Sequence, residues 1–354
     1  MSGSGYRAHP SDGKEILRVL ESSAAAGRVE VVYSRRPDAY ESYMKESGEA
    51  HVFVARDGNA ITGTCAELVR EVYIGGEICR AAYLCGLKKD AEYRGRIGFG
   101  PEFVRELRKD DIDYYYCSVL SENADIRSSF EKCSSLISMR RIADCHTCVV
   151  NPKARIRIPS HNFTFRRARG SDTERLLDFL NAEGRKKDMF PVIRNLDAFY
   201  GLAVEDFYML LNGETILAAA ALWDQTAYKQ YIVKRYGGWM KLARLCNPFF
   251  AAMRYCRLPK ENEPMAFPVL SFCVCRGDER NLFTILLHEM MQITAKRYGM
   301  LVFSLTEDHF AWPVMNGIRC IRLESTLYEL DFPWSKQKNR SLDPKHLSLE
   351  CGWL

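Results

Sequence analysis

Residues 94–100 combine the two residue types that proteins use most often to bind phosphate groups, arginine and glycine. Arg94 and Arg96 carry the charge, three glycines lie among them, and an apolar helical pattern begins at Phe103. A helix N-terminus presents free backbone N–H groups and the positive end of the helix dipole, and glycines let a phosphate approach closely. The stretch predicts either a pyrophosphate-binding turn or a glycine loop with solvated arginines.

The familiar nucleotide-binding motifs do not match this turn. A Rossmann fingerprint lies early in a β-α-β series, whereas this turn follows the fourth expected strand and has a different glycine spacing. A Walker loop requires Gly-Lys-Ser/Thr, which is absent. The turn must therefore be interpreted from the elements around it.

Those elements repeat along the chain. The stretch "RAHPSDGKEILRVL" (7–20) matches "RARGSDTERLLDFL" (167–180), and both begin a helix at Ser-Asp. The next matching pair are hairpins that turn at Asp57-Gly58 and at Asn212-Gly213, where a tight turn needs residues with positive φ. These matches in the same order indicate an internal duplication.

The duplication continues to the end of each half. Apolar strands at 81–87 and 268–275 each lead through Arg-Gly into a helix, and further strands at 114–120 and 301–307 follow. This order predicts an α/β (α+β) protein of two lobes, each a mixed, mostly antiparallel sheet flanked by helices. We predict a first lobe at residues 1–150, a linker at 151–162, and a second lobe at 163–354 with an insertion at 234–266.

The turn and its surroundings resemble a known superfamily. "YLCGLKKDAEYRGRIGFG" resembles the acyl-CoA-binding motif of the GNAT N-acetyltransferases, and "ENADIRSSFEKCSS" (122–135) resembles their second motif at Asn123 and Lys132. Over nearly the whole chain the order of parts is similar to bacterial tandem-GNAT proteins of undefined substrate. The resemblance implies acetyl-CoA, or another acyl-CoA, as cofactor and a small-molecule or peptide amine as acceptor.

The resemblance also implies which residues contact the cofactor. They are Leu87, Lys88, Lys89, Arg94, Gly95, Arg96, Ile97, Gly98, Phe99, Gly100, Asn123 and Phe130. In the family, the strand before the turn supplies the backbone N–H that stabilises the oxyanion, which here falls around residues 87–89. The motif departs from the family at Ile97, where glycine is usual, and at Phe130, which replaces the tyrosine that protonates the CoA thiolate.

Acid–base catalysis therefore needs other groups. No carboxylate lies in residues 81–89, and the candidates are Tyr116, Glu122 and Tyr114 at the end of the next strand, each of which can equally be structural. Because Phe130 cannot donate a proton, a non-catalytic acyl-CoA-binding or regulatory protein is one alternative. A tandem-GNAT aminoacyl transferase is another.

The second lobe differs at the equivalent turn. There the sequence "CRGDERNLFTILL" (275–287) has one glycine and places Asp278 and Glu279 at the helix start. Acidic residues suit a helix N-terminus but repel a pyrophosphate at the same place. We therefore expect acyl-CoA in the first lobe only, with the second lobe shaping the acceptor site.

The insertion in the second lobe is basic and aromatic. Residues 234–260 contain seven Lys or Arg residues and no Asp or Glu, together with Tyr236, Trp239, Phe249, Phe250 and Tyr255. One interpretation is a lid or platform for an anionic or aromatic acceptor, and another is a membrane-surface contact. A third interpretation, which we favour, is a pair of helices whose aromatic residues belong to the core, because aromatic residues at helical spacing usually pack inside the protein.

Composition narrows the remaining function classes. The net charge of +5 is too small for a dedicated nucleic-acid binder, and no apolar run reaches the 18 or so residues of a membrane-spanning helix. The N-terminus lacks a secretory signal, so we expect a cytoplasmic protein with reduced thiols. Cys145 and Cys148 have the spacing of half a zinc site, but no second half is present, and we predict no metal.

Overall fold

The computed structural model describes residues 6–24, 29–95, 101–107, 111–121, 137–334 and 342–354. The first part of the chain forms α1 (Gly13–Glu21), β1 (Val29–Ser34), α2 (Ala39–Glu46), β2 (Glu49–Asp57), β3 (Ala60–Ile74), β4 (Glu77–Lys89), α3 (Pro101–Leu107), β5 (Tyr114–Leu120) and β6 (Ser138–Val150). The second part forms β7 (Thr164–Arg167), α5 (Thr173–Gly184), β8 (Phe207–Asn212), β9 (Thr215–Trp223), β10 (Gln230–Tyr236), α6 (Met240–Leu245), α7 (Asn247–Ala252), β11 (Val269–Cys275), α8 (Arg280–Thr294), β12 (Leu301–Thr306) and β13 (Cys320–Asp331).

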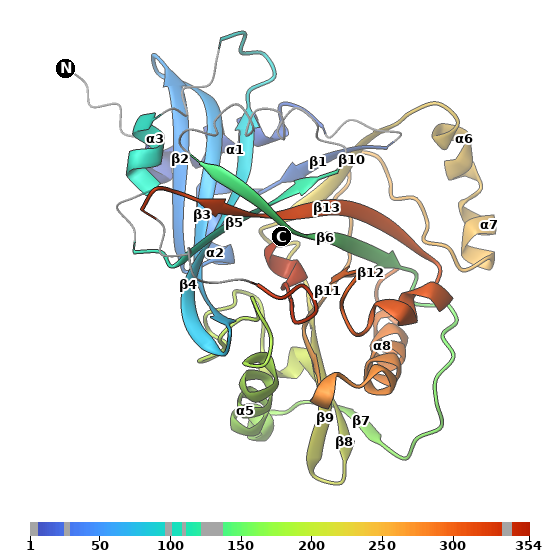
Figure 1. Cartoon of the computed structure of the whole chain (residues 1–354). Helices are drawn as coiled ribbons and strands as arrows, with labels where there is room; N and C mark the ends of the chain where they lie inside the picture. Colours follow the sequence, from blue (N-terminus) through green and yellow to red (C-terminus); the bar gives the residue numbers. More distant parts are fainter. Residues whose placement is uncertain (1–5, 25–28, 96–100, 108–110, 122–136, 335–341) are drawn as a thin grey trace.

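One 11-stranded sheet joins both halves (Figure 1). Its order is β2-β3-β4-β5-β13-β6-β12-β11-β9-β8-β7. Read inward from one edge, the first-lobe strands follow the order β2-β3-β4-β5. Read inward from β8, which lies beside the edge strand β7, the second-lobe strands follow the corresponding order β8-β9-β11-β12, and β4–β5 and β11–β12 are the parallel pairs. The predicted mixed, mostly antiparallel, two-lobe architecture is therefore confirmed.

The two lobes exchange their last strands at the centre of the sheet. β6, which follows the first lobe's β5 along the chain, pairs with β12, whereas β13 follows β12 and pairs with β5. β6 and β13 also pair with each other in antiparallel fashion over most of their length. This exchange means that neither half can complete its sheet alone. The boundaries at residues 150 and 163 remain a prediction, although residues 151–163 contain no helix or strand.

Both predicted hairpins form. β2 and β3 turn at Gly58 with φ of 58°, and β8 and β9 turn at Gly213 with φ of 57°. A separate antiparallel ribbon of β1 and β10 provides a second connection between the halves. The predicted insertion starts at the end of β10, at residue 234, and continues into α6 and α7, which lie at the margin of the molecule in Figure 1.

Helices cover both faces of the sheet. One core cluster packs α1, α2 and α5 against strands of both lobes, including Ile16, Tyr43 and Leu180. On the opposite face α3 packs against the first lobe and α8 against the second. Among the described residues no helix combines the length and apolarity needed to cross a bilayer. Cys145 and Cys148 are buried in β6.

Candidate active site

Strands β4 and β5 begin side by side and then separate. They pair in parallel where Ala81–Tyr83 face Tyr114–Tyr116. β4 then continues along β3 to Lys89, while β5 continues along β13 to Leu120. We call the unpaired stretch, Leu84–Lys89 against Cys117–Leu120, the first-lobe opening. Its facing backbone edges have no strand partner within the described residues, so a ligand with amide groups of its own can pair there.

A β-bulge shapes β4 at this opening. The register against β3 shifts between Thr64 and Ala66, and Gly86 on the bulge has φ of 63°, a conformation that favours glycine. A Cβ at Gly86 would lie 2.2 Å from the hydroxyl of Tyr43, which is fully buried. Both backbone angle and space therefore require glycine here.

Replacing Gly86 with alanine should destabilise the protein by about 2–3 kcal/mol, because it adds backbone strain and a steric conflict with Tyr43. In a Tyr43→Phe background the penalty should fall to about 1 kcal/mol, since the nearest ring carbon is 3.3 Å away and only the φ strain remains. Tyr43→Phe alone should be nearly neutral, because the hydroxyl has no hydrogen-bond partner among the residues that the structure describes. Denaturant unfolding of the four proteins measures this coupling. Equal penalties in both backgrounds would rule out the Tyr43 contact as the cause.

Two tyrosines stand where the paired stretch ends. The rings of Tyr83 and Tyr116 lie 5.0 Å apart, and the Tyr83 hydroxyl is 2.5 Å from Ser118 Oγ. Burial raises the pKa of Tyr116, and the nearby Arg70 guanidinium opposes this only in part. The hydroxyl of Tyr116 therefore stays protonated at neutral pH, as a proton donor to a leaving thiolate must.

Tyr114 lies in the paired stretch and is committed to a different contact. Its hydroxyl donates to Glu329 Oε2 at 2.9 Å, and Arg140 also pairs with that carboxylate. Burial raises the pKa of Tyr114 well above its usual range, and the charge of Glu329 raises it further. Tyr116 is therefore the better placed of the two tyrosines.

A buried ionic cluster lies beside the first-lobe opening. Glu46, at the end of α2, accepts hydrogen bonds from Arg35, from Arg70 at 3.4 Å and from Lys229 at 3.3 Å. All four residues are at most 8% exposed. Burial alone would raise the pKa of Glu46, but the charges of Arg35, Lys229 and Arg70 outweigh it and hold this pKa at about 2. We call these four residues the Glu46 cluster.

The Glu46 cluster connects to the bulge through aromatic rings. The Arg35 guanidinium stacks 3.7 Å from the centre of the Tyr43 ring, whose hydroxyl lies against Gly86. On the other side Arg70 stacks 4.2 Å from the centre of the Trp353 ring. Charges from the first lobe and from β10 thus hold the wall of the opening in place.

The remaining predicted cofactor contacts divide into two groups. Leu87 and Lys89 on β4 are exposed, and Lys88 donates to the Ser23 carbonyl at 2.8 Å, with burial lowering its pKa. Arg94 and Gly95 are exposed on the turn after β4. The others lie outside the described residues: Arg96, Ile97, Gly98, Phe99, Gly100, Asn123 and Phe130, together with the candidate base Glu122.

The equivalent opening in the second lobe is filled by the chain itself. β11 and β12 pair only at Val269 and Val302, and β11 has its own bulge at Phe272, where φ is 52°. The Phe272 N–H donates to Glu350 Oε2 at 2.7 Å. From β12, Ser304 Oγ donates to Cys351 Sγ at 3.1 Å. Residues 348–353 thus occupy the place that is open in the first lobe.

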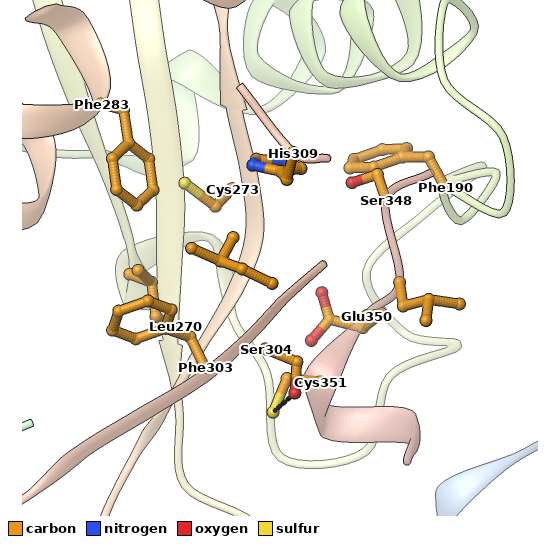
Figure 2. Close-up of a pocket in the computed structure, with 12 residues that line it drawn as sticks. Phe190, Leu270, Cys273, Phe283, Phe303, Ser304, His309, Ser348, Glu350 and Cys351 are labelled. Carbon is orange, nitrogen blue, oxygen red and sulfur yellow. Dashed lines mark hydrogen bonds between the residues drawn. The ribbon is translucent and has the colours of Figure 1, made fainter. Parts of the chain in front are cut away.

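We call residues 348–353 the plug. A cavity of about 450 Å³, its open mouth included, remains beside the plug. Figure 2 shows His309 and Cys273 on one side of it and Glu350 and Ser348 on the other. Burial raises the pKa of Glu350, while the backbone N–H groups of Phe272 and Gly352 oppose this. Burial lowers the pKa of His309 to about 4, so its ring is neutral at physiological pH.

The turn after β11 is likewise satisfied internally. Lys187 pairs with Asp278, and the Gly277 N–H donates to Glu183 Oε2 at 3.4 Å. These carboxylates lie at the second-lobe turn that corresponds in sequence to the glycine turn of the first lobe. The sequence identified the acidic residues of this turn itself, and the structure adds a further carboxylate, Glu183 from α5.

Solved structures share the fold of this chain. The yeast Saccharomyces cerevisiae N-myristoyltransferase with bound myristoyl-CoA aligns over 99% of this chain and 90% of its own, with a TM-score of 0.60 and 7% identity. A conserved Enterococcus faecalis V583 protein, described as a probable N-acyltransferase, aligns over 91% of this chain and 71% of its own, with a TM-score of 0.50 and 11% identity. The chain has the GNAT fold. Neither protein-family models nor curated proteins match its sequence.

The GNAT fold also brings together a polar cleft that the sequence did not reveal. It lies where β5 and β12 both end on the β6–β13 pair, and its lining is Ser121, Arg141, Asp144, His146, Glu307, Glu324, Thr326 and Tyr328. His146 is 6% exposed and stacks on Trp312 at 4.6 Å, with Nε2 3.2 Å from Glu307 Oε1. The sequence singled out this histidine's neighbours, Cys145 and Cys148, but gave no signal for Glu307, directly after β12, or Glu324 on β13.

Proposed function

We propose that this protein is an N-acyltransferase that transfers an acyl group from acyl-CoA, acetyl-CoA in the first instance, to the amine of a small molecule or peptide. The observation that carries the proposal is the contrast between the two openings. In the first lobe a bulged β4 separates from β5, and Leu87 on β4 and Leu120 on β5 are 37% and 50% exposed. In the second lobe residues 348–353 fill the same place.

The first-lobe opening suits the amide-bearing arm of CoA. Unpaired strand edges offer hydrogen bonds to such an arm, as an added strand would receive. Lys88 and Lys89 lie at the end of β4 and Arg94 on the turn after it, and we propose that they supply positive charge for the phosphates. A backbone N–H on the bulged strand around residues 87–89 is the proposed donor to the oxyanion.

In the proposed reaction the neutral amine nitrogen attacks the thioester carbon. A C–N bond forms, the carbonyl oxygen becomes an oxyanion, and the C–S bond then breaks to release the CoA thiolate. The amine loses one proton to a base, for which Glu122 remains the candidate, and the thiolate gains one proton from an acid. We assign the acid role to Tyr116 because it stands at the point where β4 and β5 part.

Tyr116→Phe should lower the rate of acyl transfer about 10²-fold or more, in line with the loss of one acid catalyst, without weakening acyl-CoA binding. Single-turnover assays with a panel of amines measure the chemical step, and calorimetry measures the affinity. Tyr114→Phe is the matched control, because its hydroxyl is committed to Glu329. Full single-turnover activity in Tyr116→Phe would show that another group is the acid.

The polar cleft is the proposed acceptor region. It begins at Ser121, directly after the exposed Leu120, and its carboxylates Asp144, Glu307 and Glu324 outnumber the one arginine, Arg141. A protonated amine is attracted to such a surface before it loses its proton to react. The amine panel therefore includes diamines and basic peptides beside neutral amines, and the proposal expects the cationic acceptors to have the lower KM.

A non-catalytic acyl-CoA-binding protein is the second candidate, favoured by Phe130 at the position of the usual proton donor. Tight CoA binding with no acylation of any amine would support this candidate. Acetyl-CoA and myristoyl-CoA are compared as donors, since the yeast neighbour was solved with myristoyl-CoA. In either case we propose a cytoplasmic setting, because the described cysteines are free thiols.

A further inference from the structure

The insertion does not pack as its sequence suggests. Of its aromatic residues Tyr236 is buried, but Trp239, Phe249 and Tyr255 are 59%, 62% and 41% exposed. The expectation that these aromatics belong to the core is therefore wrong for those three. The reason is that α6 and α7 have six residues each and lie at the margin of the molecule, where little chain can cover them (Figure 1).

The exposed side chains form a consistent surface on the two helices. Trp239 and Leu242 are three positions apart at α6, and Phe249 and Met253 are four positions apart at α7, so each pair shares one helix face. Leu242 is 69% exposed and Met253 is 40% exposed. We call these four residues and Tyr255 the α6–α7 patch.

The patch is held rigidly from beneath. The Tyr236 hydroxyl donates to the Pro259 carbonyl at 2.8 Å. Asn247 and Leu258 exchange two hydrogen bonds of 3.0 and 2.8 Å, and Asn151 donates to the Tyr255 carbonyl at 2.6 Å. The apolar side chains are therefore presented to solvent by a fixed support.

Positive charge surrounds the patch. Residues 234–260 carry seven basic residues and no acidic ones. Arg235 pairs with Glu30 and Lys260 with Glu263, while Lys241, next to Leu242, and Arg257, two residues after Tyr255, are exposed. Exposed Trp, Leu and Phe ringed by Lys and Arg are typical of segments that lie in the interface of an anionic bilayer.

We propose that the α6–α7 patch docks the protein onto an anionic lipid membrane surface, with Trp239, Leu242 and Phe249 inserted into the headgroup region. A lipid bilayer suits the patch better than a nucleic acid, because Leu242 and Met253 are aliphatic and offer no ring for base stacking. The inference is independent of acyl transfer. It predicts a surface contact through two short helices.

Vesicle flotation tests the proposal, with the full chain and vesicles of phosphatidylcholine alone or mixed with phosphatidylserine. The wild type should float with the anionic vesicles, and high salt should weaken its binding. Trp239→Ser/Leu242→Ser/Phe249→Ser and, separately, Lys241→Glu/Arg244→Glu should each reduce affinity about 10-fold or more. Met44→Ser/Ile78→Ser is the matched control, since those residues are 38% and 48% exposed on α2 and β4, and it should bind as the wild type does.

A second readout reports on Trp239 itself. The other four tryptophans are buried or half-buried, so quenching by brominated lipid should be lost in Trp239→Ser. Vesicle binding that survives the triple change would overturn the proposal. The proposal would also be overturned if the wild type shows no lipid affinity and instead dimerises in sedimentation velocity, or binds RNA, and the triple change abolishes that dimer or that binding. Acyl-CoA affinity in the triple variant should equal that of the wild type, which separates this result from the fate of the proposed function.

Discussion

Glu46→Gln should destabilise the protein by about 3–5 kcal/mol, the cost typical of breaking a buried ion pair by removing one partner. The change preserves shape but leaves the charges of Arg35, Arg70 and Lys229 facing a neutral amide. Equilibrium unfolding in denaturant at neutral pH measures the loss. Because the Glu46 cluster forms the wall behind the Gly86 bulge, acyl-CoA affinity should fall as well.

The matched control is Glu41→Gln, on the same helix but exposed, which should change stability by less than about 0.5 kcal/mol. The pH dependence follows from the lowered pKa of Glu46. Its stabilising contribution is fully present above the usual value of 4.5 and is lost as the pH falls from there toward about 2. A Glu46→Gln protein as stable as the control would contradict the ionic account of this wall.

Gly98→Asp should reduce acyl-CoA affinity about 100-fold or more, because it adds bulk and negative charge where the pyrophosphate is expected to meet the backbone. Gly98 lies outside the described residues, so this expectation rests on the sequence motif and on the open state of the neighbouring β4 and β5. Calorimetric titration with CoA gives the affinity directly.

The same substitution in the second lobe is the control. Gly299 is exposed, and a Cβ there would meet no atom within 4 Å, so Gly299→Asp adds an equal charge without a steric cost. Its CoA affinity should stay within about 2-fold of the wild type. Equal weakening in both variants would indicate a general charge effect, and no weakening in Gly98→Asp would place the phosphates elsewhere.

Local patterns in the sequence were sufficient for the repeated elements. The hairpin turns at Gly58 and Gly213 and the apolar strands on either side form as their residues predict, because turn chemistry and alternation act over a few residues. The exchange of β6 and β13 could not be predicted in this way. Each of these strands satisfies the same pattern beside either lobe, and the choice depends on contacts between distant parts of the chain.

The candidate site shows the same division. The turn residues around Arg94 and the acidic Asp278 could be identified by type and spacing. The Glu46 cluster joins residues up to 194 positions apart in the sequence, Arg35 and Lys229, because the packing of the folded chain brings them together. The plug at residues 348–353 carries no motif, and its role depends on Glu350 reaching the bulge N–H of Phe272.

Hydrogen exchange with and without acyl-CoA tests the central claim most directly, because it reports on the backbone N–H groups of both openings in one experiment. The account predicts that acyl-CoA slows exchange in the first lobe, over residues 84–95 of β4 and its turn and over 117–120 of β5. Exchange at 269–278 and 348–353 should not change, because the second opening is already occupied by Glu350 and its neighbours. Protection at β11 and displacement of residues 348–353 on acyl-CoA binding would contradict it.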